Sequence, residues 1–170
     1  MRNPLLFSLA LLGSSAAQAA ELDLGLELPA PAGAEYHRPY VAVWLETPDQ
    51  VHVADLAVWY DLAKPDHQGE KWLKDLRQWW RRSGRDLDLP VDGLSAATRP
   101  AGTHHLHYSS QKAPLRDLKA GQYRVVVEAA RENGGRELVR LPLSWPPASP
   151  EHQQIQGQAE LGLVSLQTTP

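Results

Sequence analysis

The chain contains 170 residues, with 17 basic and 20 acidic side chains and a net charge of −3 when histidine is neutral. This mildly acidic balance does not favour nucleic acid or an anionic membrane surface as a partner. The chain has no cysteine, which excludes disulfides, thiolate metal sites, iron–sulfur clusters and cysteine nucleophiles within it. Its fold must therefore be held together by packing, for which six Trp and five Tyr are available.

The first 19 residues follow the order typical of a cleavable secretory signal peptide. Arg2 gives a cationic start, residues 5–12 form an apolar run, and residues 17–19 (AQA) place small side chains at the two positions that a signal peptidase must seat. The apolar run is far shorter than the roughly 20 residues of a membrane span. We therefore expect cleavage near Ala19 and export to the periplasm without a lipid or membrane anchor. Residues 20–170 have a length suited to a single domain.

The first strands are indicated by period-two alternation. Residues 21–28 alternate leucine with polar residues or glycine, which predicts a strand with one buried face. Residues 39–46 and 51–60, joined by a turn at 48–50, predict a hairpin. Both of its faces carry apolar residues, so we expect this pair to be central in its sheet.

A helical period follows over residues 71–83 (KWLKDLRQWWRRS), which predicts the only helix of the chain. At this spacing Trp72, Leu76 and Trp79 share one face, and we expect them to pack on the core. Gly84 stands where a helix-ending glycine is common.

The second half of the chain predicts further strands at residues 103–109, 122–131, 136–145 and 158–167, with a hairpin turn at 133–135 (NGG). About seven strands and one inserted Trp-rich helix, without alternation of strands and helices, predict an all-β fold, an antiparallel β-sandwich.

A cluster of histidines lies on the strand predicted at 103–109. His105 and His107 point to one face of that strand and His104 points to the other. Two imidazoles two residues apart on a strand can share a metal ion such as Cu²⁺, Zn²⁺ or Ni²⁺, with a further ligand from elsewhere in the fold. The alternative is an exposed strand face that tolerates polar rings.

The predicted helix offers a second candidate site. Trp80, with Arg77 and Arg81 beside it, is a surface that could stack on a ring and hold an anionic group. The alternative is that the helix caps the sandwich and its Trp residues pack in the core. Arg38, before Pro39, is a further loop cation, and we expect Arg131 to form a structural ion pair with a nearby acid.

Signatures of catalysis are missing from the chain. It contains no Gly-x-Ser-x-Gly, no His-Glu-x-x-His and no glycine-rich phosphate loop after a strand. We therefore expect a non-enzymatic protein.

Several stretches resemble a known family. They are RPYVAVW (38–44), LAVWY (56–60), KWLKDLRQWWR (71–81), DGLSAATRPAGTHHLHY (92–108) and AGQYRVVVEAARENGGRELVRLPL (120–143). Together they are similar to a family of predicted periplasmic proteins classed as domain of unknown function 2271.

The resemblance implies an exported bacterial domain with an immunoglobulin-like β-sandwich. It also implies a role beside membrane proteins of the PepSY type and flavin-carrying periplasmic proteins, in redox or iron-uptake systems. We therefore expect an accessory or binding domain that contacts such a partner, or its flavin, haem or metal ion. A periplasmic metal-binding protein that uses the histidine cluster is the alternative.

Overall fold

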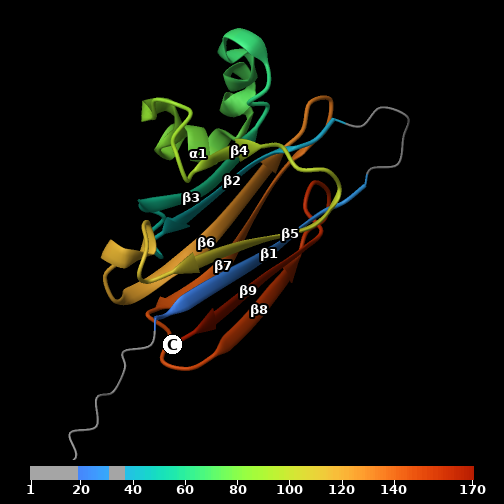
Figure 1. Cartoon of the computed structure of the whole chain (residues 1–170). Helices are drawn as coiled ribbons and strands as arrows, with labels where there is room; N and C mark the ends of the chain where they lie inside the picture. The colour runs from blue at the N-terminus through green and yellow to red at the C-terminus, as the bar shows by residue number, and fades with distance from the viewer. Residues whose placement is uncertain (1–18, 31–36) are drawn as a thin grey trace, which may run out of the picture.

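The computed structural model describes residues 19–30 and 37–170, and these residues form two β-sheets with a helical layer on one of them (Figure 1). The strands are β1 (Glu21–Leu28), β2 (Tyr40–Glu46), β3 (His52–Tyr60), β4 (Ser95–Ala97), β5 (Gly102–Ser109), β6 (Gly121–Ala130), β7 (Arg136–Trp145), β8 (Glu151–Gln156) and β9 (Leu163–Thr169). The helical segments are η1 (Pro65–Asp75), α1 (Arg77–Arg82), η2 (Gly84–Asp86) and η3 (Leu115–Asp117), where η marks a 3-10 helix. The all-β sandwich predicted from the sequence is confirmed.

The four-stranded sheet has the order β5-β1-β9-β8, and all its pairs are antiparallel. Strand β1 shows why alternation predicts it well: its four leucines are buried, whereas Glu21, Asp23 and Glu27 lie on the opposite, outer face. The inner face packs on the second sheet, and the outer face is polar.

The five-stranded sheet has the order β4-β3-β2-β6-β7, in which β3 and β4 are parallel and the other pairs antiparallel. Strands β2, β3 and β6 are apolar on both faces, as expected for a central position. One face contributes Val43 and Val127 to the core between the sheets, and the other contributes Trp44 and Val126 to a second core beneath the helical segments.

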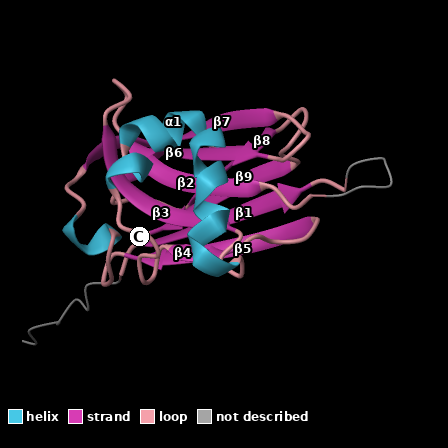
Figure 2. Ribbon diagram, turned by 90° about the horizontal axis from the view of Figure 1, so that it is seen from above, coloured by secondary structure: helices cyan, strands magenta, loops and turns pink. Residues whose placement is uncertain are grey.

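The helical layer covers the outer face of the five-stranded sheet, as the view from above shows (Figure 2). Leu73, Leu76 and Trp79 are its fully buried anchors. Each apolar side chain removed from water in this way stabilises the fold by about 2 kcal/mol relative to its exposed state.

The expected single α-helix over residues 71–83 is wrong in its first half. Residues up to Asp75 belong to 3-10 turns, Leu76 breaks the helix with ψ of 70°, and only Arg77–Arg82 is α-helical. In a 3-10 helix, residues three apart share a face. Leu73 and Leu76 therefore face the sheet together, and Trp72 is 42% exposed instead of packed on the core.

Two strands were not expected. β4 has three residues, which is too short for a recognisable period, and β8 reads EHQQIQ, which lacks regular apolar alternation. The last strand begins at Leu163, whereas the predicted strand began at residue 158.

The expected signal peptide covers residues 1–19. Residues 1–18 lie outside the described residues, and Ala19 is the first residue that the structure describes. In the part of the chain that the structure describes, no helix has the length and apolar character needed to cross a membrane.

Candidate binding site

One end of the five-stranded sheet gathers segments that are far apart in the sequence. Antiparallel pairing sets Tyr40, at the start of β2, opposite Ala130, at the end of β6, and sets Val41 opposite Trp59, near the end of β3. The residues before β2 and those after β3 and β6 are therefore neighbours. Loops that meet at a sandwich end on rigid strands are common recognition sites.

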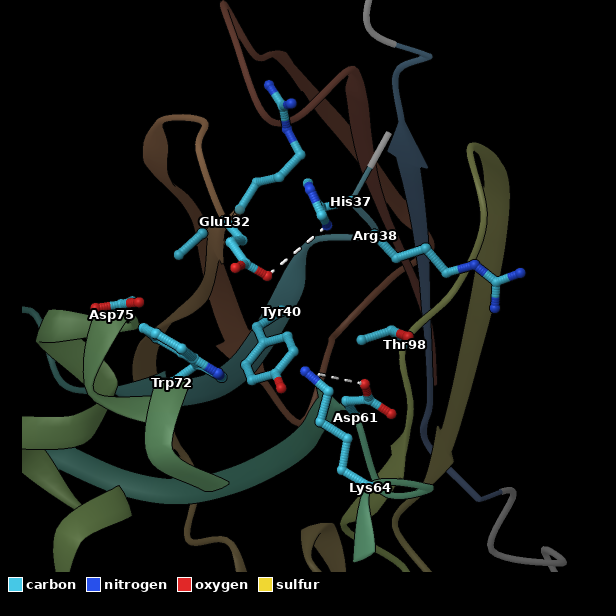
Figure 3. A pocket seen from close by; sticks show the side chains of 11 residues that line it. His37, Arg38, Tyr40, Asp61, Lys64, Trp72, Asp75, Thr98 and Glu132 are labelled. Atoms are coloured by element: carbon cyan, nitrogen blue, oxygen red, sulfur yellow. Dashed lines mark ion pairs between the residues drawn. The ribbon is translucent and has the colours of Figure 1, made fainter. Parts of the chain in front are cut away.

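A pocket of about 320 Å³ lies at this end, between the strand ends and η1 (Figure 3). Its lining consists of His37, Arg38, Tyr40, Asp61, Lys64, Trp72, Asp75, Thr98, Ala130, Arg131 and Glu132. Trp72 and Asp75 come from η1 on one side, and Thr98 faces them from the chain after β4, with Tyr40 between the two sides (Figure 3). The volume is at the lower end of the range for small-molecule sites.

Tyr40 joins the sheet to the helical layer at the base of this pocket. Its hydroxyl donates a hydrogen bond of 2.9 Å to the carbonyl of Gly69, and its ring meets Tyr60 edge-on at 6.4 Å. Burial raises the pKa of the Tyr40 hydroxyl above its usual value. Position 69 requires glycine, because a Cβ there would clash with the backbone carbonyl of Asp61. The ring is thus held in place.

Two pairs of an acidic and a basic side chain face the pocket. Lys64 Nζ lies 3.6 Å from Asp61, and His37 Nδ1 lies 3.7 Å from Glu132 (Figure 3). Each pair joins an acidic side chain to a basic one.

Arg131 carries the ion pair expected of it. Its guanidinium donates hydrogen bonds of 2.8 and 3.1 Å to Glu160, whose side chain is 5% exposed. Burial by itself raises the pKa of Glu160, but the bonds from Arg131 and from the Gly135 N–H outweigh it and lower that pKa. This pair closes the β6–β7 hairpin beside the pocket and is structural.

The helical layer beside the pocket is fixed by two acids of the sheet. Glu128, fully buried on β6, accepts hydrogen bonds from the backbone N–H groups of Gln78 and Trp79 and from the Arg136 guanidinium. Asp55 on β3 accepts a hydrogen bond of 2.8 Å from the Trp79 indole. The bonds to Glu128 satisfy backbone N–H groups at the start of α1 that the helix itself leaves unpaired.

Of the predicted binding residues, only Arg38 lines the pocket. Its guanidinium points away from Tyr40, toward the rim (Figure 3). Trp80 is half-buried and packs at 6.4 Å from the Trp79 ring, while Arg77 and Arg81 are exposed on α1. The structure thus separates Arg38 from the α1 residues, which lie outside the pocket lining.

Of the histidine cluster, His105 and His107 lie on the polar outer face of the four-stranded sheet, whereas the ring of His104 meets Trp59 edge-on at 5.7 Å. His105 and His107 share that face, as expected from their spacing. His107 Nδ1 is 2.8 Å from Asp23 and its Nε2 is 2.9 Å from Glu21, so both ring nitrogens face carboxylates of β1. The hydrogen bond and the charge of Asp23 raise the His107 pKa.

That arrangement is one of an imidazolium held between two acids. The described residues contain no group of three or more His, Asp or Glu side chains placed to hold a metal ion. Metal binding by His105 and His107 stays a prediction.

A family model described as "Predicted periplasmic protein (DUF2271)" matches residues 21–163 of the chain. The chain belongs to the DUF2271 family. The expected family and the periplasmic location that its description gives are thereby confirmed. A search of curated proteins and a search of solved structures each gave no match.

Sequence reasoning missed most of the pocket residues of this DUF2271 protein, among them Tyr40, Asp61, Lys64, Thr98 and Glu132. No motif marks them, because they meet only through the pairing of β2 with β3 and β6 and of β3 with β4. Their one sequence signal is position: each lies at or just beyond a strand end.

Proposed function

We propose that this DUF2271 protein is a non-enzymatic periplasmic binding module that works beside a PepSY-type membrane protein or a flavin-carrying periplasmic protein of a redox or iron-uptake system. The observation that carries the binding role is the pocket at the sandwich end, in which an exposed Trp72 stands beside paired charges. The accessory role and the immunoglobulin-like class of the sandwich belong to the same proposal, and the motif resemblance supports them.

Pairing of the pocket charges favours recognition over catalysis. A general base needs a proton-accepting group free to face a substrate. In the described pocket, the carboxylates of Asp61 and Glu132 each face a basic side chain instead, that of Lys64 and that of His37. Such pairs are suited to hold a fixed pattern of hydrogen-bond donors and acceptors.

The helical layer supplies a surface for the protein partner. Arg77 and Arg81 project from α1, whose start is held by Glu128 and whose Trp79 is fully buried. A rigid helix with exposed cations loses little conformational freedom on docking, which favours association with an acidic partner surface.

Site-specific photocrosslinking in intact cells tests the partner. We would replace Arg81 or Trp72 with p-benzoylphenylalanine, and Gln154 as the control. Gln154 is exposed on the outer face of the four-stranded sheet, far from the helical layer in the fold. We expect light-dependent adducts with a PepSY-type membrane protein or a flavin-carrying protein from the first two positions, identified by mass spectrometry. Adducts of equal yield from all three positions, or none from Arg81 and Trp72, would overturn the proposal.

A further inference from the structure

The pocket lining is electrically balanced. Its basic side chains are Arg38, Lys64 and Arg131, and its acidic side chains are Asp61, Asp75 and Glu132, with His37 in addition. An anion that entered would meet carboxylates as closely as cations. The lining therefore does not select a phosphate or carboxylate ligand, for which clustered cations are the usual recognition device.

Each ion pair presents a donor and an acceptor side by side. Lys64 Nζ and Asp61 are 3.6 Å apart, and His37 and Glu132 are 3.7 Å apart. A hydroxyl group donates one hydrogen bond and accepts up to two, so it can contact both members of such a pair. The two pairs come from opposite sides of Tyr40 (Figure 3), and a ligand with hydroxyls on several edges can reach both.

An aromatic wall completes the arrangement. Trp72 is 42% exposed and borders the pocket opposite Thr98, whose hydroxyl adds a further donor and acceptor. A large exposed aromatic ring is suited to pack against the C–H face of a saturated ring, while its indole N–H remains available for a hydrogen bond. Aromatic packing and hydroxyl recognition thus occur in one cavity.

We infer that the pocket binds a neutral, hydroxyl-rich ligand of the saccharide class, one or two rings in size. The inference rests on the proposed function as a binding module and specifies its ligand. The pocket volume of about 320 Å³ limits the ligand to a small molecule. The same balance of charge disfavours a flavin nucleotide or haem in this pocket, because the phosphate or propionates of those groups add negative charge.

NMR spectroscopy of the purified exported protein tests this inference through the tryptophan indole N–H signals. The chain has six Trp, and the signal lost in a Trp72→Phe variant identifies Trp72. We would add glucose, N-acetylglucosamine, maltose and cellobiose, and separately inorganic phosphate and FMN, each up to about 20 mM, because single-ring ligands commonly bind in the millimolar range. We expect at least one neutral sugar to shift the Trp72 signal at a lower concentration than phosphate or FMN.

Two Asp→Asn variants, one inside the pocket and one outside it, supply the test and its control. Asp61→Asn removes a pocket carboxylate, and we expect it to weaken sugar binding about tenfold. Asp86→Asn makes the same change at a 73% exposed side chain outside the pocket lining, and we expect unchanged binding. The other indole signals report whether each variant is folded.

Two results would overturn the inference: no shift of the Trp72 signal with any of the sugars, or a shift with phosphate or FMN at lower concentration than with every sugar. The photocrosslinking experiment reads a protein partner and this one reads a small ligand, so failure of the saccharide assignment and failure of the proposed partner role are distinguishable.

Discussion

The carboxylate of Glu128 accepts a hydrogen bond of 2.9 Å from the backbone N–H of Trp79, which lies 49 residues earlier in the chain. A side chain of the sheet thus does the work that a neighbouring Ser or Asp does at most helix starts. Together with the bond from the Trp79 indole to Asp55, it fixes α1 on the five-stranded sheet. The placement of the helical layer, and with it one wall of the pocket, depends on this contact.

Glu128→Ala should therefore destabilise the protein strongly. It removes the acceptor of two backbone N–H groups and of Arg136 at a fully buried position. Losing one partner of a buried charged network costs about 3 kcal/mol, and urea unfolding would measure this loss. Asp117→Ala, at an 82% exposed side chain, is the control and should change little. Equal stability of the two variants would contradict the role assigned to Glu128.

Gly84→Ala should destabilise the helical layer by a steric route. A Cβ on Gly84 would lie 2.5 Å from the Trp79 ring, which is fully buried and cannot move aside. Overpacking of this kind costs about 1–3 kcal/mol, measurable as a shift of the urea midpoint. Gly121→Ala is the matched control, since its Cβ would meet its nearest neighbour at 3.5 Å. An equal shift in both variants would show that glycine replacement in general, not the Trp79 ring, is responsible.

Gly84 also shows where sequence reasoning gave the right position for a different reason. The residue does follow the C-cap Ser83, as a helix-ending glycine would. Its importance comes from the ring packed on it, which depends on the tertiary fold. A local sequence pattern reports the backbone preference of a position. It does not report which side chain the folded protein packs against that position.

Strands with one buried face, such as β1 and β7, were predictable because such burial leaves a period of two. The bounds of β1 and β7 agree with those expected, and β5 and β6 agree to within one residue. The first half of the helix was predicted wrongly. The apolar residues from Trp72 to Trp80 recur with a period of 3.6 residues, but the chain up to Asp75 folds as 3-10 turns. That difference turned Trp72 from an expected core residue into the exposed wall of the pocket. The remaining pocket residues follow from strand pairing, which the sequence pattern does not specify.

Glu137→Gln should lower stability at neutral pH and have a smaller effect in acid. Burial tends to raise the Glu137 pKa, but hydrogen bonds from four consecutive backbone N–H groups, of residues 158–161, lower it. A group whose pKa is lowered on folding stabilises the protein above its unfolded value of about 4.3, and this stabilisation fades as pH falls through the folded value.

The expected loss in Glu137→Gln is about 2 kcal/mol at pH 7, measured by urea unfolding between pH 3 and pH 7. Glu151→Gln, at a glutamate without such a backbone cradle, is the matched control. If the loss in Glu137→Gln stayed constant down to pH 3, the carboxylate charge would not be the source of the stabilisation.

His107 should give the opposite pH dependence. Its pKa is raised by the hydrogen bond and charge of Asp23, with a further contribution from Glu21, so the folded state holds the proton more tightly than the unfolded state. The stabilisation is complete below the unfolded pKa of about 6.5 and is lost as pH rises through the higher folded value. The stability of the wild-type protein relative to His107→Asn should therefore be larger at pH 5.5 than at pH 9. His105→Asn changes a neighbouring histidine on the same sheet face and serves as the control in the same urea series. A difference between wild type and His107→Asn that grew with rising pH would show that the neutral ring, and not the imidazolium between Asp23 and Glu21, is the stabilised form.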